Sequence, residues 1–230
     1  MTDSGRTIPG YSGSDDGMTL YCKAGPDGKT IGDCPFCHAI RLVLEELHLA
    51  YQLIPATPET KPSWLLDHFE GKMPALRHGN SCYTESSVII DYLLGLSHNQ
   101  LSQANSNEAA NAGLFPAIAK YLKHRPDNDE EDRTLRSKLK TILQRMDANL
   151  AGTSFWNGES FTETDCKIAP QLYHLQCGVA AFQKDIDLEE YANLSGYMKN
   201  LFDRESFQST VYPAETVVWG WSNARKCTEH

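Results

Sequence analysis

The segment from Met18 to Leu47 constrains the fold more than any other part of this sequence. A short run of strand-forming residues, MTLYCK, leads into a turn rich in glycine, and the residues CPFC then open a long helical pattern. Pro35 suits the first helical position, because the N–H that proline lacks would have no partner there. Cys34 is therefore predicted to be the N-cap residue. One face of the predicted helix carries the apolar residues Phe36, Ile40, Val43, Leu44 and Leu47.

An alternation of strands and helices continues up to residue 97. Its spacing predicts strands at 51–54, 75–77 and 81–84, the last two as a hairpin, and helices at 62–69 and 86–96. The order of elements over residues 18–97 is β-α-β-α-β-β-α, which indicates an α/β domain. Polar residues predominate over residues 98–111, and this composition is typical of a linker.

Residues 112–230 show helical periods and few strand signals, so an all-helical domain is predicted there. The acidic run Asp129–Asp132 precedes one clear apolar face and complements the positive end of a helix dipole. The segment Thr162–Asp165 has the pattern of a capping box that starts another helix. The apolar face consists of Leu135, Leu139, Ile142, Leu143, Met146 and Leu150.

Composition argues against several functional classes. A net charge of −9 disfavours nucleic acid as a partner, since phosphate binding needs clustered Lys and Arg. No stretch of the sequence approaches the roughly 20 apolar residues of a membrane helix. Seven cysteines are an odd number for a disulfide framework, and the single CPFC pair lacks the second pair of a zinc site. Free thiols in a reducing compartment, without a metal, are the better interpretation.

The first seventeen residues are rich in glycine, serine and aspartate. They lack the apolar core of a secretory signal, and they are too acidic for a transit peptide. Residues 1–17 are therefore predicted to be a disordered tail, and the protein is expected in the cytoplasm.

Cys34 is the candidate catalytic residue. A free thiol has a pKa near 8.5, and a helix N-terminus lowers that pKa to roughly 3.5–7.5, so we expect Cys34 to be a thiolate at neutral pH. Lys23 would add positive charge, whereas the neighbouring Asp33 would raise the pKa and is better explained as a group that holds a polar substrate or moves a proton. Cys37 lies one turn later; packing is favoured over a role as resolving thiol, but both remain open.

Two further segments suit a peptide-like ligand. The bond between Met73 and Pro74 precedes a strand, and a cis bond there would turn the Met73 backbone toward such a ligand, whereas a trans turn is the ordinary alternative. Glu85 and Ser86 stand just before a predicted helix, whose free N–H groups bind carboxylates. Glu85 would pair with an ammonium group, which suits the γ-glutamyl end of glutathione. Capping of the helix by Ser86 alone explains the pattern equally well.

Taken together, these motifs resemble those of the glutathione transferase superfamily. The run LYCKAGPDGKTIGDCPFC is similar to two of its branches, the dehydroascorbate reductases and the chloride intracellular channel proteins. Later segments, among them LVLEELHLAY, EGKMPAL, TESSVIIDYL, YMKNLFDRESFQST and VVWGWSNARK, resemble the dehydroascorbate reductases of plants and algae. The resemblance covers residues 18–226. It implies a thioredoxin-like, glutathione-binding domain over residues 18–97, followed by an all-α domain.

The resemblance also implies an activity: reduction of dehydroascorbate by two glutathiones, through a mixed disulfide on Cys34. Glutathione would be a co-substrate, no metal would take part, and the protein would act as a monomer without stable insertion into membranes. Positions carried over for ascorbate are Lys23, Asp33, His174 and Trp221. Those carried over for glutathione are Lys61, Met73, Pro74, Glu85 and Ser86.

Two positions depart from the family pattern, and other functions remain as alternatives. Cys37 replaces a serine of most plant enzymes, which leaves an internal disulfide with Cys34 open, and Glu85 replaces an aspartate. The alternatives are a general glutathione-dependent thiol reductase, a channel-like membrane-associating protein and a catalytically silent module. Glu45 and Glu46 interrupt the first helix and argue against the channel. The intact CPFC helix start argues against the silent module.

Overall fold

The computed structural model describes residues 5–11, 16–97, 101, 108–125, 129–182 and 184–226. The chain divides into two compact units, residues 1–102 and 103–230. This boundary falls inside the segment predicted to be a linker. The prediction was wrong for the last four residues of that segment, because Glu108–Asn111 form the short helix α4.

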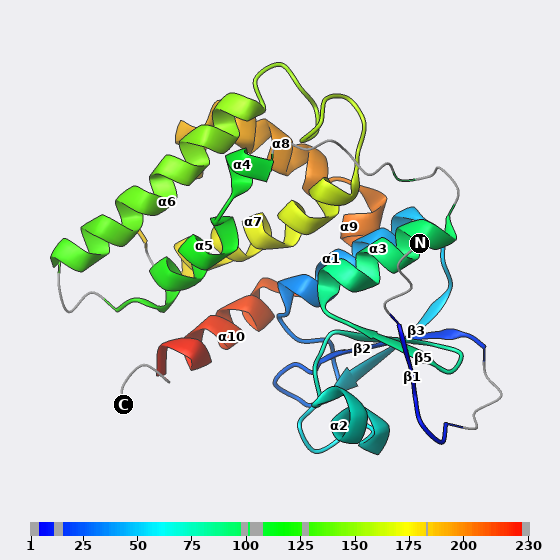
Figure 1. Cartoon of the computed structure of the whole chain (residues 1–230). Coiled ribbons are helices and arrows are strands. Elements are labelled where there is room, and N and C mark those ends of the chain that lie inside the picture. Colours follow the sequence, from blue (N-terminus) through cyan, green and yellow to red (C-terminus); the bar gives the residue numbers. More distant parts are fainter. Residues whose placement is uncertain are drawn as a thin grey trace. The chain divides into compact units, whose positions relative to one another are not determined.

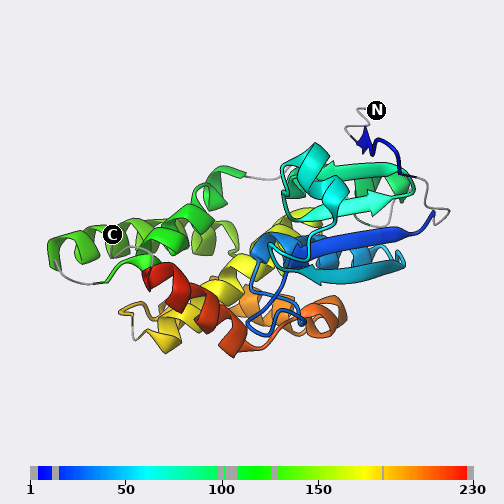
Figure 2. The ribbon, with the colours of Figure 1, turned by 90° about the horizontal axis from the view of Figure 1, so that it is seen from below.

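The first unit is built on a mixed sheet with the strand order β1-β5-β4-β2-β3. Strands β2 and β3 are parallel, whereas β4 pairs antiparallel with both β2 and β5. Helices α1 and α3 lie side by side on one face of the sheet, and α2 lies on the other (Figure 1); Figure 2 shows the strands from the side of α2. The bounds are β1 Arg6–Thr7, β2 Met18–Lys23, α1 Pro35–Glu46, β3 Tyr51–Ala56, α2 Ser63–Phe69, β4 Ala75–His78, β5 Ser81–Thr84 and α3 Ser86–Leu96.

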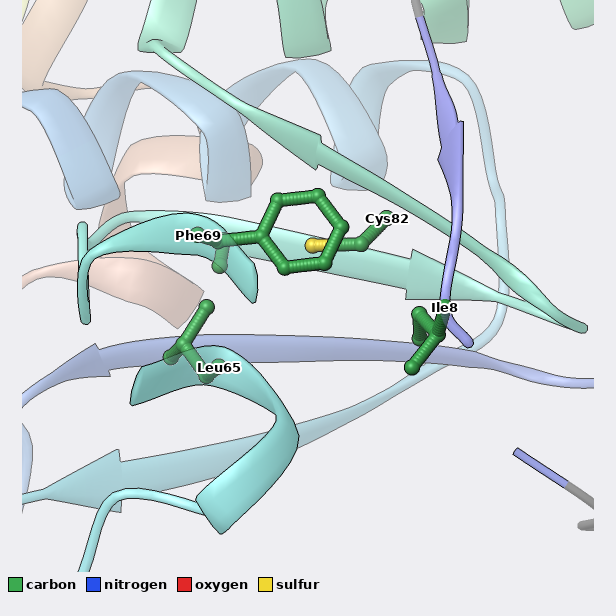
Figure 3. Close-up of a cluster of buried hydrophobic side chains, with 5 residues drawn as sticks. Ile8, Leu65, Phe69 and Cys82 are labelled. Atoms are coloured by element: carbon green, nitrogen blue, oxygen red, sulfur yellow. The ribbon is translucent and has the colours of Figure 1, made fainter. Parts of the chain in front are cut away.

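The predicted disordered tail was wrong for residues 5–11. Arg6 and Thr7 form β1, which pairs antiparallel with β5, and Ile8 is only 2% exposed. Ile8 packs in a buried cluster with Leu65, Phe69 and Cys82 (Figure 3). A strand of two residues leaves no periodic signal in a sequence, and its partner, the open edge of β5, exists only after folding. Residues 1–4 and 12–15 lie outside the described residues.

The apolar face of α1 is buried as predicted, with one exception. Ile40, Val43, Leu44 and Leu47 belong to the core. Phe36, which the helical period placed on the same face, is 41% exposed. It occupies the first turn, directly after the N-cap and Pro35. The helical period shows on which side of a helix a side chain lies. It does not show how far along the helix other elements cover that side.

In the described part of the second unit, the regular elements are helices, apart from one isolated bridge between Phe155 and Gly158. Helix α7 packs against α5, α8 and α10, so it forms the core of the unit. The prediction of an all-helical second domain is confirmed. In the described part of the chain, no helix is long and apolar enough to cross a membrane. After α4, the bounds are α5 Leu114–Lys123, α6 Asp129–Asn149, α7 Glu163–Ala181, the 3₁₀ turn Leu188–Glu190, α8 Ala192–Phe202, α9 Glu205–Thr210 and α10 Ala214–Lys226.

The buried carboxylate of Asp165 organises the start of α7. One of its oxygens accepts hydrogen bonds from the backbone N–H of Thr162 at 2.8 Å and from the Thr162 hydroxyl at 3.0 Å. Its other oxygen accepts from the backbone N–H of Trp156 at 2.9 Å and from the Tyr197 hydroxyl at 2.7 Å. The capping box predicted from the sequence is therefore present, and it also ties α8 and the preceding loop to the helix.

Substitution of Asp165 by alanine removes every one of these acceptors inside the core. We expect Asp165→Ala to lower the free energy of unfolding by about 3 kcal/mol, because buried donors left without partners are costly. Urea denaturation followed by circular dichroism measures this change. Asp203→Ala, which removes an exposed ion pair with Lys199, is the control and should change stability by less than about 0.5 kcal/mol. Equal effects of the two variants would contradict the structural role of Asp165.

Candidate active site

Cys34 stands at the N-terminus of α1, as the sequence predicts. It is the N-cap residue, with φ −76° and ψ 111°, and Pro35 follows at the first helical position. Its side chain is half-buried. The backbone N–H groups of Cys37 and Phe36 lie close enough to its sulfur to lower the pKa of the thiol. The sulfur is thus held at the N-terminus of α1 by a residue that is partly exposed.

The loop between β2 and α1 sets the position of Cys34. Gly32 donates its N–H to the carbonyl oxygen of Lys23 at 2.8 Å, and a Cβ at Gly32 would lie 2.6 Å from the carbonyl oxygen of Ala24. Only glycine permits this approach. Asp27 braces the same loop by accepting hydrogen bonds from Thr30 and Lys29, and these donors lower its pKa to about 2. The loop thereby returns the chain from the end of β2 to the start of α1.

Lys23 and Asp33 form an ion pair across the ends of this loop. The Nζ of Lys23 lies 2.8 Å from Oδ1 of Asp33. Asp33 is nearly buried, whereas half of the Lys23 side chain is exposed. The sequence assigned these residues separate and opposing effects on the thiol. In the structure the two charges pair with each other, and Asp33 directly precedes Cys34 in the chain.

The thiol of Cys34 belongs to a row of cysteine side chains. The Cys37 thiol, which is 1% exposed, shares hydrogen bonds with Cys34 and with the buried Cys22 of β2. The pKa of Cys34 is raised well above its ordinary value, mainly by the hydrogen bond with Cys37 and then by burial. Burial likewise raises the pKa of Cys37. The expectation of a thiolate at neutral pH was therefore wrong for the protein without ligands, because the helix end is outweighed by the neighbouring thiol and by desolvation.

A raised pKa has a measurable consequence. Below the pKa the thiolate fraction rises about tenfold for each pH unit, so alkylation of Cys34 by iodoacetamide should accelerate throughout the range from pH 6 to pH 9. In Cys37→Ala the dependence of the alkylation rate on pH should shift to lower pH. This variant removes the hydrogen bond with Cys37, which is the largest cause of the raised pKa. Mass spectrometry of the Cys34 peptide gives the rate. A rate that is already constant above pH 6 in the unmodified protein would contradict the raised pKa.

The pairing of the strands gathers the other predicted groups at one edge of the sheet. Ala75, which follows Pro74, pairs with Tyr21 near the end of β2 and with Thr84 at the end of β5. The start of β4 therefore lies between the ends of β2 and β5. The residues that leave these strand ends, Pro74, Lys23 and Glu85, emerge at the same edge of the sheet.

The loop before β4 contains a cis peptide bond between Met73 and Pro74, so the cis form considered from the sequence is confirmed. Met73 packs against the cluster that contains Leu65 and Phe69. Lys61, at the other end of α2, donates from Nζ to the carbonyl oxygen of Gly71 at 2.7 Å. An ammonium group has three donors, so this bond leaves capacity for a ligand.

The N-terminus of α3 carries the remaining predicted groups. Glu85 is its N-cap, with the unusual φ of 69°, and Ser86 is its first helical residue. The alternative of an N-cap at Ser86 was wrong, and among the described residues no side-chain hydrogen bond caps this helix end. Its N–H groups are a suitable place for a carboxylate.

Lys72 is a residue that the sequence interpretation missed. Its Nζ lies 3.8 Å from Oε1 of Glu85 and 3.5 Å from Oε2 of Glu70. The signal for it was its position in the GKMP segment, directly before Met73. Lys72 places a positive charge beside the exposed carboxylate of Glu85, so this corner of the site presents both signs of charge to a zwitterionic ligand end.

His174 and Trp221 lie in the second unit, on α7 and α10. His174 is 1% exposed, and its Nε2 lies 2.8 Å from the hydroxyl of Tyr212. The rings of His174, Trp221 and Phe115 contact one another. Both residues thus contribute to an aromatic cluster within their own unit. That they reach over Cys34 remains a prediction.

In the part of the chain that the structure describes, no three His, Cys, Asp or Glu side chains are grouped as metal ligands would be. Cys227 lies outside that part.

Both units of the chain resemble known proteins. The protein-family model of the glutathione S-transferase N-terminal domain matches residues 30–100. The family model of the C-terminal domain matches residues 107–200. Glutathione S-transferase DHAR2 of Arabidopsis thaliana is 32% identical over 196 residues, which is 84% of this chain and 91% of the relative. A probable cytosolic glutathione S-transferase DHAR1 of Oryza sativa is 30% identical with the same coverage. The crystal structure of Chlamydomonas reinhardtii dehydroascorbate reductase superposes with a TM-score of 0.81 at 27% identity, covering 92% of this chain and all of that one.

Proposed function

This chain belongs to the glutathione S-transferase family, and we propose that within it the chain is a dehydroascorbate reductase, which reduces dehydroascorbate to ascorbate with glutathione. The observation that carries the proposal is the half-buried thiol of Cys34 at a helix N-terminus, in a unit that also carries the cis Met73–Pro74 bond and the uncapped start of α3. The similarity to the dehydroascorbate reductase of Chlamydomonas reinhardtii over its whole length supports the same substrate.

The reaction proceeds in three steps, an addition and two thiol exchanges, all of which involve Cys34. The Cys34 thiol adds to a carbonyl carbon of dehydroascorbate: a carbon–sulfur bond forms, and the proton that leaves the thiol passes to the carbonyl oxygen. The thiolate of a first glutathione attacks the Cys34 sulfur; the carbon–sulfur bond breaks, its electron pair remains with ascorbate, and a mixed disulfide forms. A second glutathione thiolate attacks the glutathione sulfur of this disulfide, releasing Cys34 and glutathione disulfide. Two glutathiones thus supply the two electrons that dehydroascorbate gains.

The groups around Cys34 divide between the two substrates. Asp33 directly precedes Cys34 in the chain, and its ion pair with Lys23 offers a donor and an acceptor that suit the hydroxyl and carbonyl groups of dehydroascorbate. His174 and Trp221 are proposed to complete this side of the site from the helical unit. The glutathione side consists of Lys61 for the glycyl carboxylate, Met73 and Pro74 for the peptide backbone, and Glu85 and Ser86 for the γ-glutamyl end.

Cys34→Ser should abolish the activity, since a hydroxyl forms no disulfide. Recombinant protein is assayed for glutathione-dependent formation of ascorbate from dehydroascorbate, by the absorbance of ascorbate. Cys37→Ser is the matched control: it lies one turn away, is buried, and should retain most of the turnover at saturating glutathione if Cys37 serves packing. Undiminished turnover in Cys34→Ser would refute the mechanism. Loss of most turnover in Cys37→Ser would instead make Cys37 the resolving thiol.

Asp33→Ala separates the two halves of the site. We expect it to weaken the apparent affinity or turnover for dehydroascorbate about tenfold, the range for loss of a charged hydrogen bond, while the KM for glutathione changes little. Steady-state kinetics with each substrate varied in turn measures the difference. Equal effects on both substrates would contradict the assignment of Asp33 to dehydroascorbate.

A second candidate function follows from the contact between Cys34 and Cys37. A pair of neighbouring thiols also suits a general glutathione-dependent thiol reductase, because the second thiol can displace glutathione from the first. The rates on dehydroascorbate and on a glutathionylated peptide distinguish the two functions. A preference for the peptide would favour the reductase of mixed disulfides.

The cellular setting is proposed from the relatives. We place the protein in the cytoplasm, in line with the relative from rice that is named cytosolic, and we expect it to work as a monomer. Cell fractionation and sedimentation analysis test the two statements.

A further inference from the structure

We propose that the N-terminal segment Arg6–Ile8 positions helix α2 for glutathione binding, with Arg6 and Ile8 as positioning residues for the glutathione side of the site. The inference rests on the proposed function. The segment lies outside the residues proposed to contact glutathione. The sequence alone predicted it to be disordered.

Arg6 is attached to the last turn of α2. Its Nη2 donates a hydrogen bond of 2.6 Å to the carbonyl oxygen of His68, and its Cζ lies 4.5 Å from the centre of the Phe69 ring. The carbonyl groups of a last helical turn have no partner within the helix, and a positive charge there is favourable. One side chain thus makes a helix-end hydrogen bond and a cation–π contact with the same turn.

Ile8 holds the same helix from the interior. Its side chain lies in the cluster with Leu65 and Phe69, two buried residues of α2, and with Cys82 of β5 (Figure 3). The backbone of the segment is anchored independently, because Arg6 pairs with Cys82 and Thr7 pairs with Ser81. The segment therefore connects the edge of the sheet to α2.

Both ends of α2 lead into the glutathione side of the site. Lys61 directly precedes the N-cap Pro62, and residues 70–72 connect Phe69 to Met73 and Pro74. The hydrogen bond from Lys61 to Gly71 joins the two ends. Trp64 and Met73 pack against the same cluster as Ile8. A displacement of α2 would therefore move Lys61 and Met73 together.

The groups assigned to dehydroascorbate are held by other means. Lys23 and Asp33 pair with each other, and Gly32 binds the end of β2. Cys34 is fixed by α1, which lies on the opposite face of the sheet from α2 (Figure 1). Loss of the contacts of Arg6 or Ile8 should thus affect the binding of glutathione and leave that of dehydroascorbate unchanged.

The experiment compares Arg6→Ala and Ile8→Ala with the unmodified full chain. We expect the KM for glutathione to rise about three- to tenfold in both variants. Arg6→Ala loses an exposed cation–π contact together with a helix-end hydrogen bond, and Ile8→Ala loses buried packing against Leu65 and Phe69. The kcat at saturating glutathione and the KM for dehydroascorbate should stay within about twofold. Arg6→Lys, which keeps the charge and a donor, should recover part of the affinity.

Arg204→Ala is the matched control. The Cζ of Arg204 lies 4.0 Å from the centre of the Phe161 ring in the helical unit, so this variant loses a contact of the same kind within the other compact unit. It should leave the KM for glutathione unchanged. Calorimetric titration of glutathione into each variant combined with Cys34→Ser measures the affinity without turnover.

The measurements distinguish failure of the positioning role from failure of the proposed function. If Arg6→Ala and Ile8→Ala lower the thermal midpoint but bind glutathione like the unmodified chain, the positioning role is refuted while the proposed function stands. If both substrates are affected equally, the positioning role is refuted as well. If the unmodified chain neither binds glutathione nor reduces dehydroascorbate, the proposed function itself is wrong.

Discussion

The antiparallel pairing of β4 with both β2 and β5 is the constraint on which the candidate site depends. It brings the start of one strand between the ends of two others, so that Lys23, Pro74 and Glu85 leave the sheet at a common edge. These residues are far apart in the chain. Each contributes little as a binding group by itself, and the backbone hydrogen bonds of the sheet supply the fixed spacing that a peptide ligand requires.

The chemistry of the thiol results from a competition at the start of α1. The helix end favours the charged form of Cys34, whereas the Cys37 thiol and burial favour the neutral form and prevail in the protein without ligands. A neutral resting thiol is less exposed to adventitious oxidation than a thiolate, since reactivity follows thiolate character. The row formed by Cys22, Cys37 and Cys34 thus sets the pKa of the sulfur that is proposed to react.

Much of the local structure could be predicted from the sequence. The bounds of β2 and α3 agree with their predicted ranges, and the N-cap position of Cys34 and the capping box at Asp165 were identified correctly. Each of these features depends on residues that are near neighbours in the chain. Phe36, β1 and the last residues of the predicted linker were misjudged, because their environment is created by elements that are distant in the chain.

The sequence by itself determined where α1, α3 and α7 begin, most of the apolar face of α1, and that Cys34 is the N-cap residue of that helix. Tertiary structure decided that Lys23 and Asp33 neutralise each other, that the pKa of Cys34 is raised, and that Arg6 and Ile8 reach α2. The physical reason is one of range. Capping and periodicity act between near neighbours in the chain, whereas desolvation and charge pairing depend on which distant groups the folded chain brings into contact.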